Sequence, residues 1–180
     1  MRNKFVMGGL TVAVALTLAL PAGRALAIDL DGLAKKAVGT AGDAAKGKVE
    51  KDVNAKLTAE ARKNQCSFKT DTDELAPGCD AKLKKLTNAL VEAKKHLEAG
   101  QVKSFKFEVS GHTDSAGSAE HNKQLSEKRA QVIVKELVAR GIAPSEIIAV
   151  GMGSQRPLVT PDNTPAKKAK NRRYEVQVRL

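Results

Sequence analysis

Short strand patterns alternate with two helical patterns from residue 65 to the C-terminus. The strand patterns lie at 66–70, 105–109, 147–150 and 174–180, and the helical patterns lie at 80–99 and 118–140. Strands joined by single helices form a sheet that is covered by helices on one side. The order therefore predicts an α/β (α+β) domain of βαβαβ-β form, with a proline-containing loop before the last strand. With four phenylalanines and one tyrosine in the chain, its core must be mainly aliphatic.

The N-terminus has the form of a secretory signal. Arg2 and Lys4 precede an uncharged run over 5–20, and the run is followed by the small-x-small sequence that ends at Ala27. The alternative is a membrane anchor, but the run is shorter than the roughly 20 residues that a spanning helix needs. No cysteine lies near residue 27, which argues against a lipid anchor. We therefore expect residues 1–27 to be a cleaved signal peptide.

Residues 28–64 differ in composition from the rest of the mature chain. They are rich in alanine and lysine, and their apolar residues recur every three or four positions. This periodicity predicts a weak amphipathic helix, interrupted by Gly39, Gly42 and Gly47, because each glycine costs about 1 kcal/mol relative to alanine. Such a helical arm is either a docking element for a membrane surface or an envelope protein, or a solvated linker.

The net charge of the chain limits the kinds of partner that it is expected to bind. The formal net charge of +11 falls to +8 without the three basic residues of the predicted signal. An exported basic protein meets few nucleic acids, so we expect none as a partner. Anionic wall polymer, lipid head groups or acidic proteins fit better. The two cysteines, Cys66 and Cys79, predict a disulfide in an oxidising compartment, and two buried free thiols are the alternative.

The segment GHTDSAG, residues 111–117, follows the second strand pattern and has three interpretations. Two of them are weak. His112 and Asp114 could bind a metal, but the chain has no HExxH motif and no cysteine cluster, so no metal site and no cofactor are predicted. Catalysis would need a nucleophile with a base, or two paired carboxylates, and neither is evident. The glycines of GMGSQRP, 151–157, precede prolines rather than a helix, so they do not predict a dinucleotide site.

The third interpretation is a pocket for a charged ligand. Asn122, Ser126 and Arg129 share one face of the second predicted helix. If Asp114 faces the same space, the aspartate can take an ammonium group and the arginine a carboxylate. Arg129 lies about 14 to 16 Å along this helix, so the loop after Asp114 must fold back beside it. The alternative is that Arg129 only caps or pairs within the fold.

The motifs GHTDSAG, Asn122 with LSEKRAQVIVKEL, GMGSQRP and NRRYEVQV together resemble the OmpA-like peptidoglycan-binding domain. The resemblance covers residues 65–180. It implies a two-layer sandwich with a mixed four-stranded sheet. It also implies non-covalent binding of peptidoglycan through meso-diaminopimelate, whose side-chain end carries both an amine and a carboxylate. The family implies no enzyme activity.

The resemblance also implies which residues bind the ligand. Asp114 and Arg129 match the family's central pair, and the surrounding positions follow from the same motifs. The full set is Thr70, Asp71, Thr113, Asp114, Asn122, Leu125, Ser126, Arg129, Asn171 and Arg172. Asn171 and Arg172 are expected to brace the pocket, with Arg172 also able to contact the ligand.

The chain departs from the family in three ways. PAKKAK precedes Asn171 where the family often has a glycine-arginine-alanine run, and neither a barrel domain nor a lipid-bearing cysteine is present. We therefore expect a soluble periplasmic protein, associated with the cell wall or the outer membrane. In the alternative, the chain is a structural adaptor. There the arm 28–64 binds an envelope partner or membrane, and the domain only holds the protein at the wall.

Overall fold

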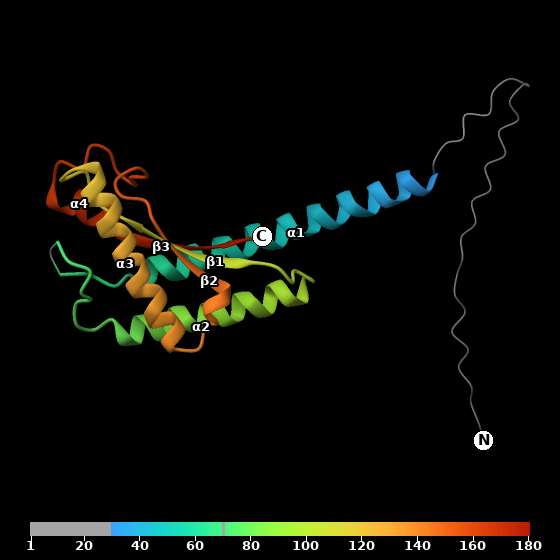
Figure 1. Ribbon diagram of the computed structural model, residues 1–180, viewed down its shortest axis with the longest axis horizontal. Helices are drawn as coiled ribbons and strands as arrows, with labels where there is room; N and C mark the ends of the chain where they lie inside the picture. Colours follow the sequence, from blue (N-terminus) through green and yellow to red (C-terminus); the bar gives the residue numbers. More distant parts are fainter. Residues whose placement is uncertain (1–29, 70) are drawn as a thin grey trace, which may run out of the picture.

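The computed structural model describes residues 30–69 and 71–180, with side chains from residue 42 on. The predicted signal peptide and Thr70 lie outside the described residues. The elements, in chain order, are α1 (Leu30–Lys63), α2 (Asp80–Ala99), β1 (Lys106–His112), α3 (Ala119–Ala139), the 3-10 turn η1 (Pro144–Glu146), β2 (Ile147–Gly151), α4 (Pro165–Asn171) and β3 (Arg173–Arg179) (Figure 1). Both predicted helices of the domain are confirmed.

The sheet is mixed, as predicted, with the strand order β2-β1-β3. β1 pairs parallel with β2 and antiparallel with β3. The register places Phe107 opposite Val178 and Val109 opposite Val176. Because side chains alternate along a strand, these apolar residues share one face of the sheet. The other face carries polar side chains such as Glu108 and Gln177.

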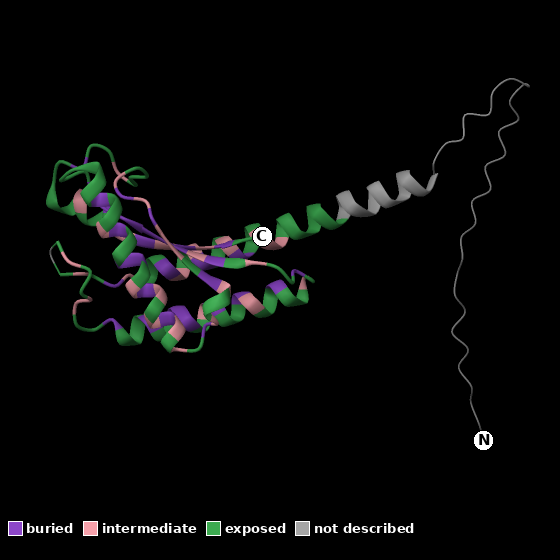
Figure 2. Cartoon of the chain, in the orientation of Figure 1, coloured by how far each residue is buried: buried purple, intermediate pink, exposed green. Residues whose placement is uncertain are grey.

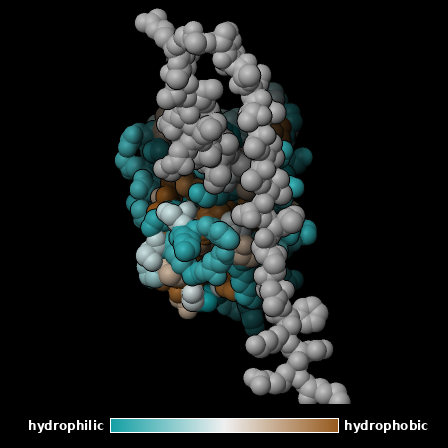
Figure 3. All heavy atoms as spheres, turned by 90° about the vertical axis from the view of Figure 1, so that its right-hand side faces the viewer, coloured by the Kyte–Doolittle hydropathy of each residue, from teal (hydrophilic) through white to brown (hydrophobic). Residues whose placement is uncertain are grey.

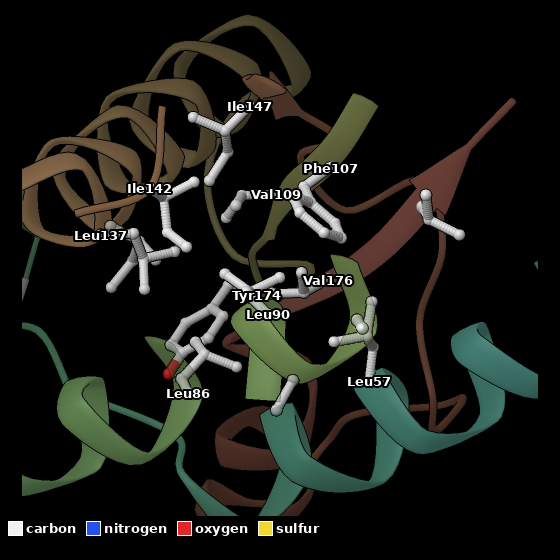
Figure 4. Packing of buried hydrophobic residues seen from close by; sticks show 14 of the residues in the cluster. Leu57, Leu86, Leu90, Phe107, Val109, Leu137, Ile142, Ile147, Tyr174 and Val176 are labelled. Atoms are coloured by element: carbon white, nitrogen blue, oxygen red, sulfur yellow. The ribbon is translucent and has the colours of Figure 1, made fainter. Parts of the chain in front are cut away.

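The core lies between the apolar face of the sheet and the helices. Leucines of α2 and α3 meet Phe107 and Val176 there, and the Tyr174 ring lies among them (Figure 4). Leu86, Leu90 and Leu137 have no exposed surface. Burial of each such side chain stabilises the fold by about 1.5–3 kcal/mol. The core is aliphatic apart from one tyrosine and the phenylalanines, which agrees with the composition.

The predicted fourth strand at 66–70 is not part of the sheet, which has three strands among the described residues. Phe68 instead forms an isolated antiparallel bridge with Leu75. The Lys69 amide donates to the Glu74 carbonyl at 2.9 Å, which closes a short hairpin. The segment cannot join the sheet beside β3 because that edge is already occupied by α1.

The side-chain amides of Asn54, in α1, and Gln65, just after α1, form hydrogen bonds with β3 that a fourth strand would otherwise form. Asn54 Nδ2 donates to the Val178 carbonyl at 3.1 Å, and the Val178 amide donates to Asn54 Oδ1 at 2.6 Å. Gln65 forms the same pair of bonds with Tyr174, at 2.8 and 3.1 Å. Each carboxamide therefore satisfies one donor and one acceptor of β3, as a neighbouring strand would.

We expect the double substitution Asn54→Ala/Gln65→Ala to lower the free energy of unfolding by about 2–5 kcal/mol, since it leaves four backbone groups of β3 without partners. Chemical denaturation measures this loss, and hydrogen exchange should show faster exchange of the Val178 and Tyr174 amides. Lys51→Ala, an exposed change on the same helix, is the control. An unchanged denaturation midpoint in the double variant would contradict this role.

The helix α1 is continuous from Leu30 to Lys63, without the predicted break at Gly47. Its C-terminal half packs into the core through Val53, Leu57 and Ala61. Its N-terminal half extends away from the body of the molecule, and residues 42–48 are exposed (Figures 1 and 2). Figure 3 shows the molecule from the right-hand side of Figure 1, and the coloured part of that face is mainly hydrophilic with scattered apolar areas. A partner for this half remains a prediction.

None of the helices described here has the length and apolar character needed to cross a membrane. One short helix, α4, lies where the sequence predicted only a loop. It begins at Pro165, and Thr164 caps it by accepting a hydrogen bond from the Lys167 amide at 3.3 Å. Proline is compatible with the first helical position because its missing N–H would have no partner there.

Candidate functional site

A cavity of about 830 Å³ lies at the end of β1, with walls from α1, α3, α4, residues 66–69 and Asp71. Thr113 and Asp114 enter it directly after β1, and Arg129 enters it from the middle of α3. Seven of the predicted ligand-binding residues line this cavity: Asp71, Thr113, Asp114, Asn122, Leu125, Arg129 and Arg172. The fold therefore brings the predicted pair, Asp114 and Arg129, to one space.

Asp114 is 9% exposed and uses both of its oxygens. Oδ2 accepts a hydrogen bond at 2.7 Å from Nη1 of Arg172, the residue between α4 and β3, and the two side chains form an ion pair. Oδ1 accepts from the Ala116 amide at 3.0 Å. The Arg172 side chain is 44% exposed, so it can turn toward a ligand while Asp114 stays in place.

The loop after Asp114 does fold back beside α3. Asn122 Nδ2 donates to the Ala116 carbonyl at 2.8 Å and so ties the loop to the first turn of the helix. Ser118 caps that helix by accepting from the His121 amide at 3.2 Å. The Ser115 amide donates to Asp162 at 2.9 Å. These bonds fix the loop at both ends.

Asp162 is a residue that sequence reasoning missed. Its carboxylate accepts from the Ser115 hydroxyl and amide and from Asn171 Nδ2. The hydrogen bonds from the Ser115 hydroxyl and from the Asn171 amide lower the pKa of Asp162 to about 2. The carboxylate therefore stays charged at neutral pH and holds the Asp114 loop against the segment before α4. No spacing rule links Asp162 to Ser115, which is 47 residues earlier.

Arg129 is anchored along one edge of its guanidinium. Nε donates to the Thr72 carbonyl at 2.8 Å, and Nη2 donates to the Lys69 carbonyl at 3.4 Å. The guanidinium carbon lies 5.1 Å from the centre of the Phe68 ring, a cation–π contact. Burial of the group, and then the positive charge of Arg172, lower the pKa of Arg129 below its usual value.

Ser126 and Asn171 support the site but do not line the cavity. Ser126 Oγ accepts from the Gly153 amide at 2.8 Å and fixes α3 against the loop after β2. Asn171 Oδ1 accepts from the amides of Leu158 and Val159, and its Nδ2 donates to Asp162. Thr113 is different, because it lines the cavity and its buried Oγ1 has no hydrogen-bond partner among the described residues. A ligand can satisfy it.

Residues 67–172 match the OmpA family, which is more than half of the chain. The chain belongs to the OmpA family. The match includes Asp114, Arg129 and Arg172, while the cavity also has walls from residues on either side of the matched region.

Three curated relatives are similar to parts of this chain. Outer membrane porin F of Pseudomonas fluorescens is 46% identical over 78 residues, 43% of this chain and 24% of that protein. The peptidoglycan-binding protein ArfA of Mycobacterium tuberculosis is 44% identical over 70 residues, 39% of this chain and 21% of that protein. The peptidoglycan-associated lipoprotein of Pseudomonas aeruginosa is 36% identical over 69 residues, 38% of this chain and 40% of that protein. The chain therefore spans a quarter or less of the first two.

Solved structures show the same fold. A MotB-like protein from Desulfovibrio vulgaris superposes with a TM-score of 0.53 at 21% identity, and covers 74% of this chain and 90% of its own. The peptidoglycan-associated lipoprotein of Burkholderia pseudomallei has a TM-score of 0.50 at 22% identity, and covers 63% of this chain and 86% of its own. At this level of identity the comparison establishes the fold of the OmpA-family domain.

His112 contributes little charge to the OmpA-family site. His112 is buried beside Ser110, whose Oγ lies 3.3 Å from Nε2. Burial, and then the charge of Arg173, lower the pKa of His112 to about 4, so it is neutral at neutral pH. His121 is exposed and pairs with Asp71 at 2.8 Å. Among the residues that the structure describes, no group of three or more potential metal ligands occurs.

Cys66 and Cys79 are both buried free thiols in the structure, so the predicted disulfide is not present. Cys66 Sγ lies 3.8 Å from the Cys79 carbonyl oxygen, so the two cysteines lie close together at the two ends of the hairpin 67–78. Burial, and then the hydrogen bond with Cys79, raise the pKa of Cys66 to about 12. The thiol is therefore protonated at neutral pH, and formation of the disulfide stays a prediction.

Proposed function

We propose that this protein binds peptidoglycan non-covalently through the side-chain end of meso-diaminopimelate in the peptide stem. The observation that carries the proposal is the meeting of Asp114, Arg129 and Arg172 at one cavity. A carboxylate that is paired with one guanidinium group, with a second guanidinium group lining the same cavity, offers both signs of charge to one ligand. Such a site suits a group that carries an ammonium and a carboxylate on the same carbon.

Each half of the ligand has a partner. The ammonium group lies against Asp114 and takes over part of its interaction with Arg172. The ligand carboxylate lies between the released Arg172 guanidinium and the Arg129 edge that does not face the Thr72 and Lys69 carbonyls. Thr113 Oγ1 then gains the hydrogen-bond partner that it lacks. Binding needs only a rotation of Arg172, which is the most exposed of these side chains.

Two relatives support the proposal through their names, a peptidoglycan-binding protein and a peptidoglycan-associated lipoprotein. We propose further that the protein acts in the periplasm, held at the wall or the outer membrane, and that it binds without catalysis.

The test is co-sedimentation with purified sacculi in the presence of a soluble competitor. Free meso-diaminopimelate should move the protein from the pellet to the supernatant in a dose-dependent way. Nα-acetyl-L-lysine is the matched control, because it keeps a side-chain ammonium and one carboxylate but has no carbon that carries both groups. If the pelleted fraction is the same with both competitors, the site does not recognise diaminopimelate.

A further inference from the structure

The cavity carries more positive charge than a single zwitterionic group requires. Its lining includes six cationic side chains, Arg62, Lys69, Arg129, Lys170, Arg172 and Arg173, and three acidic ones, Asp71, Asp114 and Glu175. His112 does not alter this balance at neutral pH because its pKa lies near 4. The excess indicates a ligand with more than one negative group.

The ion pairs show which charges are available. Arg172 pairs with Asp114, Arg173 pairs with Glu175 at 2.8 Å, and Lys69 pairs with Glu74 at 2.5 Å. Arg129 is held by backbone carbonyls. Arg62 and Lys170 remain, and neither forms an ion pair or a side-chain hydrogen bond with any described residue. Both are exposed cavity-lining residues.

These two cations come from elements other than the loop that carries Asp114 and the helix that carries Arg129. Arg62 is in the last turn of α1, the helix that takes the place of the fourth strand, and Lys170 is in the last turn of α4. The same wall also includes Thr58 of α1 and Gln65, which follows α1. The volume of about 830 Å³ is that of a pocket for a drug-sized ligand, so it has room for more than one amino-acid residue.

We propose that Arg62 and Lys170 form a second subsite that takes a further carboxylate of the stem peptide. The inference rests on the proposed function and adds the preferred chemical form of the ligand. The carboxylate belongs either to the main-chain end of diaminopimelate or to the adjacent glutamyl residue. Conversion of that carboxylate to an amide removes its charge, so the site favours the free acid over the amidated stem.

Calorimetric titration with three synthetic tripeptides tests this subsite. The first is alanyl-γ-glutamyl-diaminopimelate with all carboxylates free. The second carries an amide at the glutamyl carboxylate, and the third carries an amide at the main-chain carboxylate of diaminopimelate. All three keep the zwitterionic side-chain end. We expect one of the two amidated peptides to bind about fivefold more weakly than the free peptide, as two exposed charge interactions allow. The position of the amide in that peptide identifies the carboxylate that the subsite binds.

The double variant Arg62→Gln/Lys170→Gln should lose this preference and bind the amidated peptides as the wild type does. Lys63→Gln/Lys167→Gln removes the same charge from the same two helices outside the cavity, and should keep the preference. Equal binding of all three peptides by the wild type, or a preference that survives in the Arg62/Lys170 variant, would overturn the subsite and leave the proposed function standing. Failure of every peptide to bind would overturn both.

Discussion

Asp114→Ala should abolish sedimentation with sacculi, and Arg129→Ala should do nearly the same. Each change leaves the ligand's opposite charge partly buried without its partner. Loss of one member of a buried charge pair costs on the order of 2–5 kcal/mol, which is a fall of about 30-fold or more in affinity. The pelleted fraction across a range of sacculus concentrations measures this directly.

Both residues also hold neighbouring backbone, so conservative variants must accompany the alanine changes. Asp114→Asn keeps an acceptor for the Ala116 amide and loses the charge that pairs with an ammonium. Arg129→Lys keeps the charge and loses the two-pronged geometry. Each variant is expected to have a melting temperature within a few degrees of that of the wild type. A smaller fraction of each variant should nevertheless pellet with sacculi.

Lys128→Ala, the exposed neighbour of Arg129, is the control and should pellet like the wild type. Wild-type pelleting by both Asp114→Asn and Arg129→Ala would show that the protein is held to the wall by another surface. Loss of binding only in variants that also unfold would show that the two residues act through the fold.

The helices α2 and α3 and the three strands of the sheet were predictable because local patterns determine them, whereas the short helix α4 was predicted as a loop. The leucine stripe of α2 and the alternation in β1 and β3 depend only on neighbours in the chain. The fourth strand was predicted wrongly at 66–70 because its alternation is equally compatible with a two-residue bridge to Leu75. What decides between the two is the edge of β3, which Asn54 and Gln65 occupy from over a hundred residues away.

The candidate site shows the same division. Motif positions placed Asp114 and Arg129 together, and the structure confirms that they share a cavity. Sequence spacing could not show that Arg172 would pair with Asp114 across 58 positions, or that Asp162 would fix the loop. Ser126 and Asn171, which are also in the motifs, do not face the cavity. Their side chains form hydrogen bonds with backbone amides of neighbouring loops.

Gly111 links the fold to the site because the backbone of β1 lies directly against the backbone of α3 there. A Cβ atom on this residue would lie 2.1 Å from the Ser126 carbonyl oxygen and 2.9 Å from the Ser126 carbonyl carbon. Both are backbone atoms of α3, so no side-chain rotation can relieve the clash. The strand and the helix would have to separate by more than an ångström, and α3 would carry Arg129 away from Asp114.

Gly111→Ala is therefore expected to lower the free energy of unfolding by about 3 kcal/mol, the upper part of the range for overpacking, and to lower the melting temperature by about 10 °C. Gly47→Ala is the matched control, because its Cβ would meet nothing within 4 Å and it lies in an exposed helix, where alanine is favoured. The control should melt at or slightly above the wild-type temperature. At temperatures where the Gly111 variant is still folded, its sacculus binding should also be weaker, since the same displacement opens the site. A Gly111→Ala protein that melts with the wild type would mean that β1 and α3 tolerate separation at this point, and the contact would then not be what sets the distance between Asp114 and Arg129.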